Sequence, residues 1–337
     1  MKFERFGDVP STLPLIAVAV AAGLLAATAA LVARSARATE RENPPTGRFV
    51  RVRGIKLHYT DDGTGAPVVL LHGNGVTAKD WQVSGVLEGL AADRRVIAFD
   101  RPGFGYSERP RGTAWTPSRQ ADLIREALEQ LGVSRAAVVG HSWGTLVALA
   151  MALNHPAIVD RLVLISGYYF PSLRVDAALQ VAPATPVLGD VLRHTISPVV
   201  GRLMAGSVVR RLFAPAPVPE RFERFPLAMS LRPSQLRAAA EEALLMVPSA
   251  AELQDRYGEL DVSVAIIAGE GDKIVDPLAQ SNRLAQLVLK EDAQLVPGAG
   301  HMVHYYAPER VVAAVVQRAG VVDTPIEAST FAMAETR

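Results

Sequence analysis

Short apolar runs alternate with helical patterns along most of this chain, and this alternation limits the available folds more than any other feature. Six runs of four or five residues lack polar alternation, which is typical of strands buried on both faces. The segments between them repeat apolar residues at helical spacing. The alternation predicts an α/β fold, with a mostly parallel sheet covered by helices on both faces. The six runs are residues 68–71, 96–99, 136–139, 162–165, 264–268 and 293–296.

A predicted hairpin precedes these runs and brings the expected sheet to eight strands. Its strands are Phe49–Val52 and Ile55–Thr60, and the chain turns between them at Arg53-Gly54. The predicted helices of the core are residues 117–131, 145–154, 277–289 and 308–318.

The interval from residue 168 to residue 260 breaks the alternation. It shows no clear strand pattern, prolines recur in it, and helices are predicted at 199–213 and 234–247. A structureless loop of this length is rare in a compact domain, so we predict a helical insertion that covers the strand ends as a lid. The expected domain limits are 47–167 and 261–320 for the core, 168–260 for the lid and 321–337 for a loose tail.

Residues 1–46 precede the predicted core and contain the uncharged apolar stretch Leu13–Val32. A helix of about 20 apolar residues can span a bilayer, so we expect a transmembrane helix near residues 13–33 that anchors the chain. Two alternatives stay open. Ala36-Arg37-Ala38 resembles the cleavage site of a signal peptide, although the apolar core of such a signal is usually only about 7–15 residues long. A buried core helix would also be apolar on all sides.

Basic residues flank this apolar stretch unevenly, and the imbalance predicts an orientation. The positive-inside rule favours a single-pass anchor with the folded domain on the cytoplasmic side, whereas a cleaved signal would reverse that side. The stretch Asn43–Gly47 contains two prolines and predicts a linker to the domain. Lys2 and Arg5 precede the apolar stretch, and Arg34, Arg37, Arg41 and Arg48 follow it.

Composition argues against several classes of function. The formal net charge of +1 provides no electrostatic surface for nucleic acid. The absence of cysteine excludes disulfides, thiolate catalysis and cysteine-based zinc sites. No cluster of His, Asp and Glu has metal-ligand spacing, and no G-x-x-x-x-G-K-[ST] phosphate loop is present, so we expect neither a metal nor a cofactor.

The pentapeptide Gly140-His141-Ser142-Trp143-Gly144 lies between a predicted strand and a predicted helix. A G-x-S-x-G at such a junction makes a sharp turn that exposes the serine hydroxyl. Glycines flank the turn because larger side chains would clash where the chain bends so tightly. The N-terminus of the following helix favours negative charge beside the serine. We therefore predict that Ser142 is a nucleophile and not simply a turn residue.

A nucleophilic serine needs a base, and the base needs a carboxylate that orients it. His301 follows the last predicted strand, and Asp272 follows the strand before it. Because parallel strands end at one edge of a sheet, we expect both residues beside Ser142. Asp276 precedes Pro277, which indicates a helix N-cap, and it remains the alternative acid.

Four segments together resemble the α/β-hydrolases of the single-domain, lidded type, the esterase and cofactor-free haloperoxidase branch. The resemblance extends from Phe49 to Gly320, and the chain order Ser, Asp, His agrees with it. It implies that the backbone N–H groups of Asn74 and Trp143 form an oxyanion hole. The segments are LLHGNG (Leu70–Gly75), FDRPGFGYS (Phe99–Ser107), GHSWG (Gly140–Gly144) and the GEGD and GAGH pair (Gly269–Asp272 and Gly298–His301).

For several polar residues near these motifs, a structural role is expected in place of a catalytic one. His72 and the Asp100 loop are expected to shape turns, and His141 is expected to be structural because it points away from its neighbour Ser142. His304 is three residues after His301, so it is either a capping or lining residue or a substitute base.

The resemblance implies a serine hydrolase that cleaves a carboxylic ester through a Ser-His-Asp triad and an acyl-enzyme. Dehalogenases and epoxide hydrolases of this fold use Asp as the nucleophile, so Ser142 disfavours those reactions. The alternatives are a carbon–carbon bond hydrolase or a haloperoxidase of the same fold, and a non-catalytic, membrane-tethered binding module. The oligomeric state is not determined by the sequence. A hydrophobic acyl substrate is expected because the insertion contributes Tyr168, Tyr169, Phe170, Met204, Met229, Leu244, Leu245 and Met246.

Overall fold

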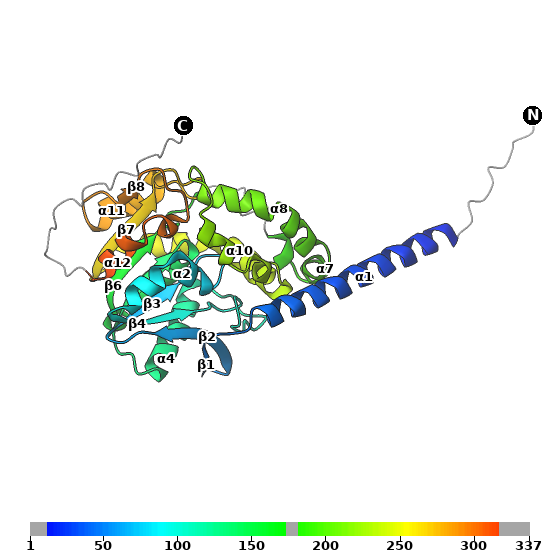
Figure 1. The fold of residues 1–337 in the computed structure, drawn as a ribbon, viewed down its shortest axis with the longest axis horizontal. Coiled ribbons are helices and arrows are strands. Elements are labelled where there is room, and N and C mark those ends of the chain that lie inside the picture. Colours follow the sequence, from blue (N-terminus) through cyan, green and yellow to red (C-terminus); the bar gives the residue numbers. More distant parts are fainter. Residues whose placement is uncertain (1–11, 173–180, 317–337) are drawn as a thin grey trace, which may run out of the picture.

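A central eight-stranded sheet organises the computed structural model, which describes residues 12–172 and 181–316 (Figure 1). The strand order is β1-β2-β4-β3-β5-β6-β7-β8. The β1–β2 and β2–β4 pairs are antiparallel, and all the other pairs are parallel. The predicted eight-stranded, mostly parallel sheet is therefore confirmed. The strands are β1 (Arg48–Val52), β2 (Ile55–Asp62), β3 (Ala66–Leu71), β4 (Arg94–Phe99), β5 (Ala136–His141), β6 (Val159–Ile165), β7 (Ser263–Gly269) and β8 (Gln294–Val296).

Both faces of the sheet are buried, as the continuous apolar runs predict. Successive strand residues point to opposite faces. Val69 and Leu71 pack in one apolar cluster with α4 and α5, and Val68 and Leu70 pack in a second cluster with α3 and α12. Every residue of β5 is buried. The core helices are α2 (Lys79–Ser84), α3 (Val86–Ala91), α4 (Pro117–Gln130), α5 (Trp143–Asn154), α11 (Arg283–Val288) and α12 (Pro308–Val316).

Most of the predicted core helices are present, with two differences. The expected helix at 277–289 begins as a π-helical turn over Leu278–Asn282 and becomes α-helical only at Arg283. The short helices α2 and α3 were not predicted from the sequence, because six residues hold too few turns to show a helical period. The tail predicted at 321–337 lies outside the described residues.

A set of helices connects β6 to β7, and we refer to residues 166–262 as the insertion. Among the described residues of the insertion, no strand is present. Its longest helix does not end before Pro248 as predicted, because Ser249, Ala250 and Leu253 are buried and hold the last turns in place. The α-helices among the described residues of the insertion are α7 (Leu188–His194), α8 (Ile196–Phe213), α9 (Leu227–Ser230) and α10 (Pro233–Gln254).

The N-terminal helix α1 (Thr12–Glu42) projects from the domain beside α7 (Figure 1). It is long and apolar enough to cross a membrane, with a mean hydropathy of 2.5 in its most apolar window. That window is almost fully exposed, which argues against a core helix. The helix continues past the predicted span, and its last turns pack on the insertion. There Val32 and Thr39 are buried, and Glu40 lies 2.7 Å from Arg232.

Candidate active site

Ser142 occupies the sharp turn between β5 and α5 that the sequence predicts. Its φ of 52° lies in the left-handed region, which is costly for any residue other than glycine. The flanking glycines have no room for a side chain. A Cβ atom on Gly144 would lie 2.3 Å from the carbonyl oxygen of Leu71, and one on Gly140 would lie 2.6 Å from the carbonyl oxygen of Gly144. The turn holds Ser142 partly exposed at the carboxyl edge of the sheet.

The structure brings Ser142, His301 and Asp272 into one hydrogen-bonded chain. His301 Nε2 lies 2.9 Å from Ser142 Oγ, and His301 Nδ1 lies 2.7 Å from Asp272 Oδ2. The second oxygen of Asp272 accepts the backbone N–H groups of Ile274 at 2.7 Å and Val275 at 3.0 Å. This carboxylate is therefore fixed in orientation, and it directs the Nδ1–H tautomer of His301, which leaves the Nε2 lone pair facing the serine.

Asp276, the alternative acid, lies outside this chain. Its carboxylate accepts the backbone N–H groups of Leu278 at 2.9 Å and Ala279 at 3.0 Å. It thus caps the start of the following helical turn, as its position before Pro277 predicts.

Of the two residues expected to form an oxyanion hole, Trp143 follows Ser142 in the chain, and Asn74 follows a glycine that lies beside Ser142. Trp143 is the first residue of α5, so its N–H group has no acceptor within the helix. Asn74 follows Gly73, where an added Cβ would lie 3.1 Å from the Cβ of Ser142. Both side chains are held by α10. The Asn74 amide donates to the carbonyl of Ala239 at 3.0 Å, and the Trp143 indole donates to that of Glu242 at 3.1 Å.

A buried ion pair between Arg101 and Glu242 joins the core to the insertion, and it was not predicted from the sequence. Both side chains are fully buried, and their shortest contact links Arg101 Nη1 to Glu242 Oε1. Arg101 also donates to the carbonyl oxygens of His72 at 2.7 Å and Gly73 at 3.0 Å. It therefore fixes the backbone that leads into Asn74. The two residues are 141 positions apart in the chain, so no local motif reports the pair.

The loop that begins at Asp100 is structural, as expected. Asp100 Oδ2 lies 2.7 Å from His58 Nδ1 and accepts the N–H of Tyr106 at 3.0 Å, and Oδ1 accepts the N–H of Ala78 at 2.9 Å. Gly105 has a φ of 53°, and a Cβ there would lie 1.8 Å from the Asp100 carboxylate. The residues of this loop support the site without reaching Ser142.

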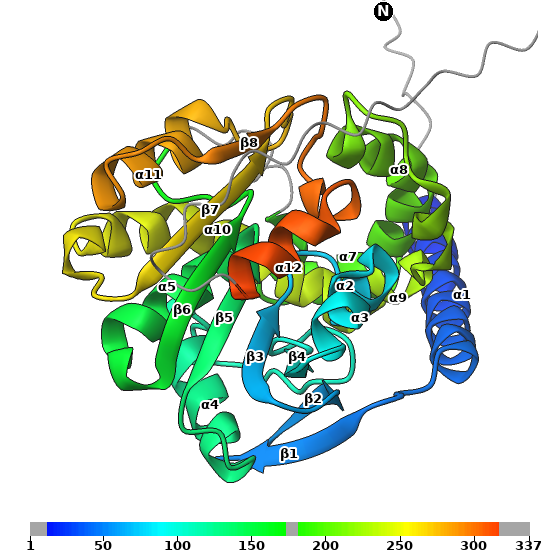
Figure 2. The ribbon, with the colours of Figure 1, turned by 60° about the vertical axis from the view of Figure 1, so that its left-hand side comes forward.

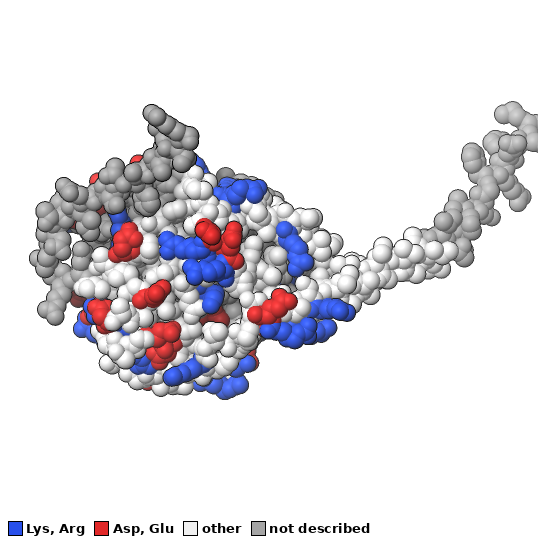
Figure 3. Space-filling view, viewed as in Figure 1, with Lys and Arg blue, Asp and Glu red and all other residues white. Residues whose placement is uncertain are grey.

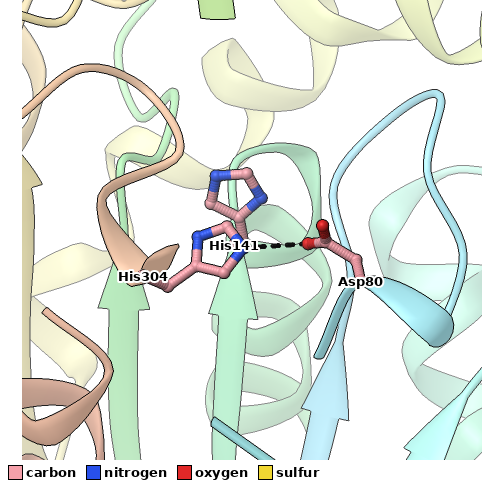
Figure 4. A group of neighbouring side chains, drawn as sticks. All are labelled: Asp80, His141 and His304. Carbon is pink, nitrogen blue, oxygen red and sulfur yellow. Dashed lines mark hydrogen bonds and ion pairs between the residues drawn. The ribbon is translucent and has the colours of Figure 1, made fainter. Parts of the chain in front are cut away.

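Behind His301 lies a second buried cluster of Asp80, His141 and His304 (Figure 4). Asp80 lies 2.9 Å from His304 Nε2 and accepts the hydroxyl of Tyr305 at 2.8 Å. His141 Nε2 lies 3.1 Å from the backbone carbonyl of His301, so it donates to the loop that carries the predicted base. Each of the three residues offers one ligand atom within 4.8 Å of the others. Asp80 and His304 Nε2 are paired with each other, whereas the Nδ1 atoms of His141 and His304 are buried without a hydrogen-bond partner.

The contacts in this cluster show structural roles for His141 and His304. His141 is structural, as expected, and His304 bonds to Asp80 and does not replace His301. Burial, together with the neighbouring His304 and His301 rings, holds the pKa of His141 well below its ordinary value. Sequence spacing did not predict the cluster, because Asp80 is 224 residues from His304.

The apolar residues expected to form a substrate pocket fall into two groups. The buried group consists of Tyr168, Tyr169 and Phe170 in the main core cluster, the partly buried Leu245 and Met246 that pack against it, and Met229 of the insertion. Met204 and Leu244 are instead exposed on the outside of the insertion. Core packing therefore accounts for the first group, and the second group lies on the molecular surface.

Comparison with known proteins identifies the family. The family described as alpha/beta hydrolase fold matches residues 66–308, which include Ser142, Asp272 and His301. The chain belongs to the alpha/beta hydrolase fold family.

Relatives of this alpha/beta hydrolase act on different bonds. It is 29% identical to the 2-hydroxymuconate semialdehyde hydrolase of Pseudomonas putida, over 80% of this chain and 92% of the relative. It is 28% identical to haloalkane dehalogenase 2 of Mycobacterium bovis, over 79% and 92%. A solved thermophilic esterase from Thermogutta terrifontis superposes with a TM-score of 0.65 at 25% identity, over 80% and 97%. Family membership makes this chain a hydrolase, and its substrate has to be argued from the site.

Proposed function

We propose that this alpha/beta hydrolase cleaves a carboxylic ester with an apolar acyl group, using Ser142 as the nucleophile. The observation that carries the proposal is the continuous chain from Ser142 Oγ through His301 to Asp272, with contacts of 2.9 and 2.7 Å. This arrangement activates a hydroxyl for attack on an acyl carbon.

In the first half of the reaction, His301 Nε2 takes the proton of Ser142 as Oγ attacks the ester carbonyl. Asp272 keeps the imidazole in the correct tautomer and stabilises the imidazolium that forms. The backbone N–H groups of Asn74 and Trp143 hold the oxyanion, and the loss of one such donor typically costs about 3 kcal/mol of transition-state stabilisation. His301 then protonates the departing alcohol, and the acyl group stays on Ser142.

In the second half, His301 removes a proton from water, which attacks the acyl-enzyme and releases the acid. The same chemistry separates this chain from its dehalogenase relative. A serine that displaced a halide would form an ether, and an ether has no carbonyl carbon for water to attack. We therefore do not propose halide displacement for this site.

A carbon–carbon bond hydrolase is the second candidate. It is favoured by the similarity to the 2-hydroxymuconate semialdehyde hydrolase of Pseudomonas putida, which extends over 92% of that relative. Such a reaction would use the same Ser142, His301 and Asp272, with a carbon leaving group in place of an alkoxide.

We also propose that α1 anchors the enzyme in a membrane, because its apolar stretch is exposed and has the length of a bilayer span. An anchored enzyme beside a lipid phase is suited to an apolar acyl substrate. The insertion would act as its lid, since α10 contacts both Asn74 and Trp143.

The test compares the full chain in detergent with Ser142→Ala on p-nitrophenyl esters from acetyl to lauroyl. We expect hydrolysis by the parent, a preference for longer chains and a silent Ser142→Ala variant. Ser166→Ala is the matched control, because Ser166 follows β6 with a φ of 46° and should keep full activity. If no ester reacts and a 2-hydroxy-6-oxo-dienoate is cleaved in a Ser142-dependent way, the second candidate replaces the first.

A further inference from the structure

The insertion exposes an unusually apolar surface beside α1. Of the 21 exposed large hydrophobic side chains among the described residues, sixteen lie on α1 or between residues 187 and 208. In α8 only Val209 and Phe213 are buried, although the helix has 18 residues. Contiguous exposed apolar patches mark sites of contact with a partner or a membrane. The exposed residues of the insertion are Val187, Leu188, Val191, Ile196, Val199, Val200, Leu203, Met204 and Val208.

The position of this surface along α1 indicates that a membrane covers it. Leu31, Val32 and Ser35 of α1 line a groove with Val199 and Leu203 of α8. Leu31 and Val32 belong to the last turn of the apolar stretch that begins at Leu13, so they lie within about 5 Å of its end. Once α1 spans a bilayer, Val199 and Leu203 are therefore level with the boundary between hydrocarbon and headgroups. Figures 1 and 2 both place α8 on the side of the molecule from which α1 extends.

Charges around this surface suit anionic lipid headgroups. Helix α8 carries Arg202, Arg210 and Arg211 and no acidic residue, and Arg202 donates to Ser35 of α1 at 3.3 Å. The acidic Asp190 of α7 is paired with two arginines. Figure 3 shows Lys and Arg side chains near an otherwise uncharged surface that continues from the domain onto α1. An apolar helix face bordered by arginines is typical of helices that lie in a membrane interface.

We propose that the outer face of α7 and α8 lies in the lipid bilayer beside α1, so that the enzyme takes its substrate from the lipid phase. The bilayer is the partner because this face is continuous with the α1 span. The entry of substrate from lipid rests on the proposed ester hydrolase function, whereas the docking of the face on the bilayer does not.

The end of α8 connects this face to the candidate active site. The carbonyl of Leu212 accepts the N–H of Met302 at 3.3 Å, one residue from His301. A Cβ on Gly300 would lie 2.6 Å from the carbonyl oxygen of Phe213. The C-terminal end of the helix that carries the docking face therefore touches the loop of the predicted base.

A depth probe tests the docking, and the absence of native cysteine makes the labelling clean. The side chain of Leu203 is 82% exposed, and it is changed to cysteine in the full chain. The Leu203→Cys protein is labelled with a nitrobenzoxadiazole dye and reconstituted in phosphatidylcholine–phosphatidylglycerol vesicles. We expect a blue-shifted emission that doxyl-labelled lipids quench. Leu287→Cys is the matched control, because Leu287 is 52% exposed and belongs to α11, which lies on the side away from α1. Its dye should show the emission of a water-exposed probe. A Leu203 probe as polar and as weakly quenched as the Leu287 probe overturns the proposal.

An activity measurement separates docking from catalysis. Leu203→Glu should lower the rate on a long-chain ester embedded in vesicles by about tenfold, and should leave the rate on soluble p-nitrophenyl acetate unchanged. Leu287→Glu should leave both rates unchanged. Equal vesicle rates for Leu203→Glu and the parent contradict entry from lipid. If the parent hydrolyses no ester, the proposed function fails, and the depth probe still decides the docking.

Discussion

At the scale of single residues, two buried histidines close to Ser142 are held neutral. Burial, and then the charge of Arg101, lower the pKa of His72 to about 3. The pKa of His141 is also far below its ordinary value. Between about pH 6.5 and pH 3 the unfolded chain therefore binds more protons than the folded chain at His72, and the lowered pKa of His141 acts in the same direction. Their contribution to stability is complete above about pH 6.5 and is lost as the pH falls below it.

His72→Gln tests this linkage. Each neutral buried histidine adds a slope of up to about 1.4 kcal/mol per pH unit to the free energy of unfolding in this window. The parent should lose stability from pH 6 to pH 4.5, and His72→Gln should lose it less steeply by roughly that amount. Guanidinium unfolding in detergent at several pH values measures the slopes. His194→Gln, at an exposed position, is the control, and equal slopes for all three proteins would exclude the assignment.

Residues with a local backbone signature could be predicted from the sequence, and residues that act through distant partners could not. Ser142, Asp272 and His301 each follow a strand within a glycine-rich turn, so the fold brings them to one edge. The roles of Arg101 and of His304 depend on partners that are far away in the chain. No periodicity or spacing in one sequence records such pairs.

At the scale of elements, strands were the easiest to predict, because burial on both faces leaves continuous apolar runs. All eight predicted strands are present. Helix limits were harder to predict in the insertion, where tertiary packing decides whether a proline ends a helix. The helix α10 continues through Pro248 because its last turns pack on the core, and the sequence around the proline does not show this.

Helix α10 also carries the carboxylate whose removal should destabilise the site most, because it would leave a buried guanidinium unpaired. Glu242→Ala leaves the Arg101 guanidinium buried without its partner, so we expect a loss of about 3–5 kcal/mol in the free energy of unfolding. Asp160→Ala, which removes the partner of Arg135 in an ion pair whose two side chains are both 61% exposed, should cost only about 1 kcal/mol or less. Guanidinium unfolding compares the two variants.

The double variant Arg101→Met with Glu242→Leu distinguishes stability from positioning. It removes both charges, so much of the lost stability should return. The carbonyls of His72 and Gly73 would still lack their guanidinium donor, so ester hydrolysis should stay low. Full activity in the double variant would show that Arg101 does not position the Asn74 loop.

At the scale of the whole molecule, the domain is tied to α1 by more than a linker. Glu40 lies 2.7 Å from Arg232, and the hydroxyl of Tyr106 bonds to the carbonyl of Asn43. The predicted linker around Asn43–Gly47 therefore begins at a point that is already packed on the domain. The proposed anchor would therefore set the depth and tilt of the enzyme, which a flexible linker would not do.

The charges that flank α1 predict on which side of the membrane the domain lies. Arg34, Arg37 and Arg41 lie directly after the apolar stretch of α1, and fewer basic residues precede it, so the positive-inside rule places the domain in the cytoplasm. The cysteine-free chain allows a direct assay with a membrane-impermeant maleimide on intact cells. Glu88→Cys, at an exposed position on α3, should react only after the cells are opened, whereas Lys2→Cys should react from outside. The reverse pattern would place the domain outside the cytoplasm. A Glu88→Cys chain that reacts from outside and has lost the mass of its first residues would instead identify α1 as a cleaved signal.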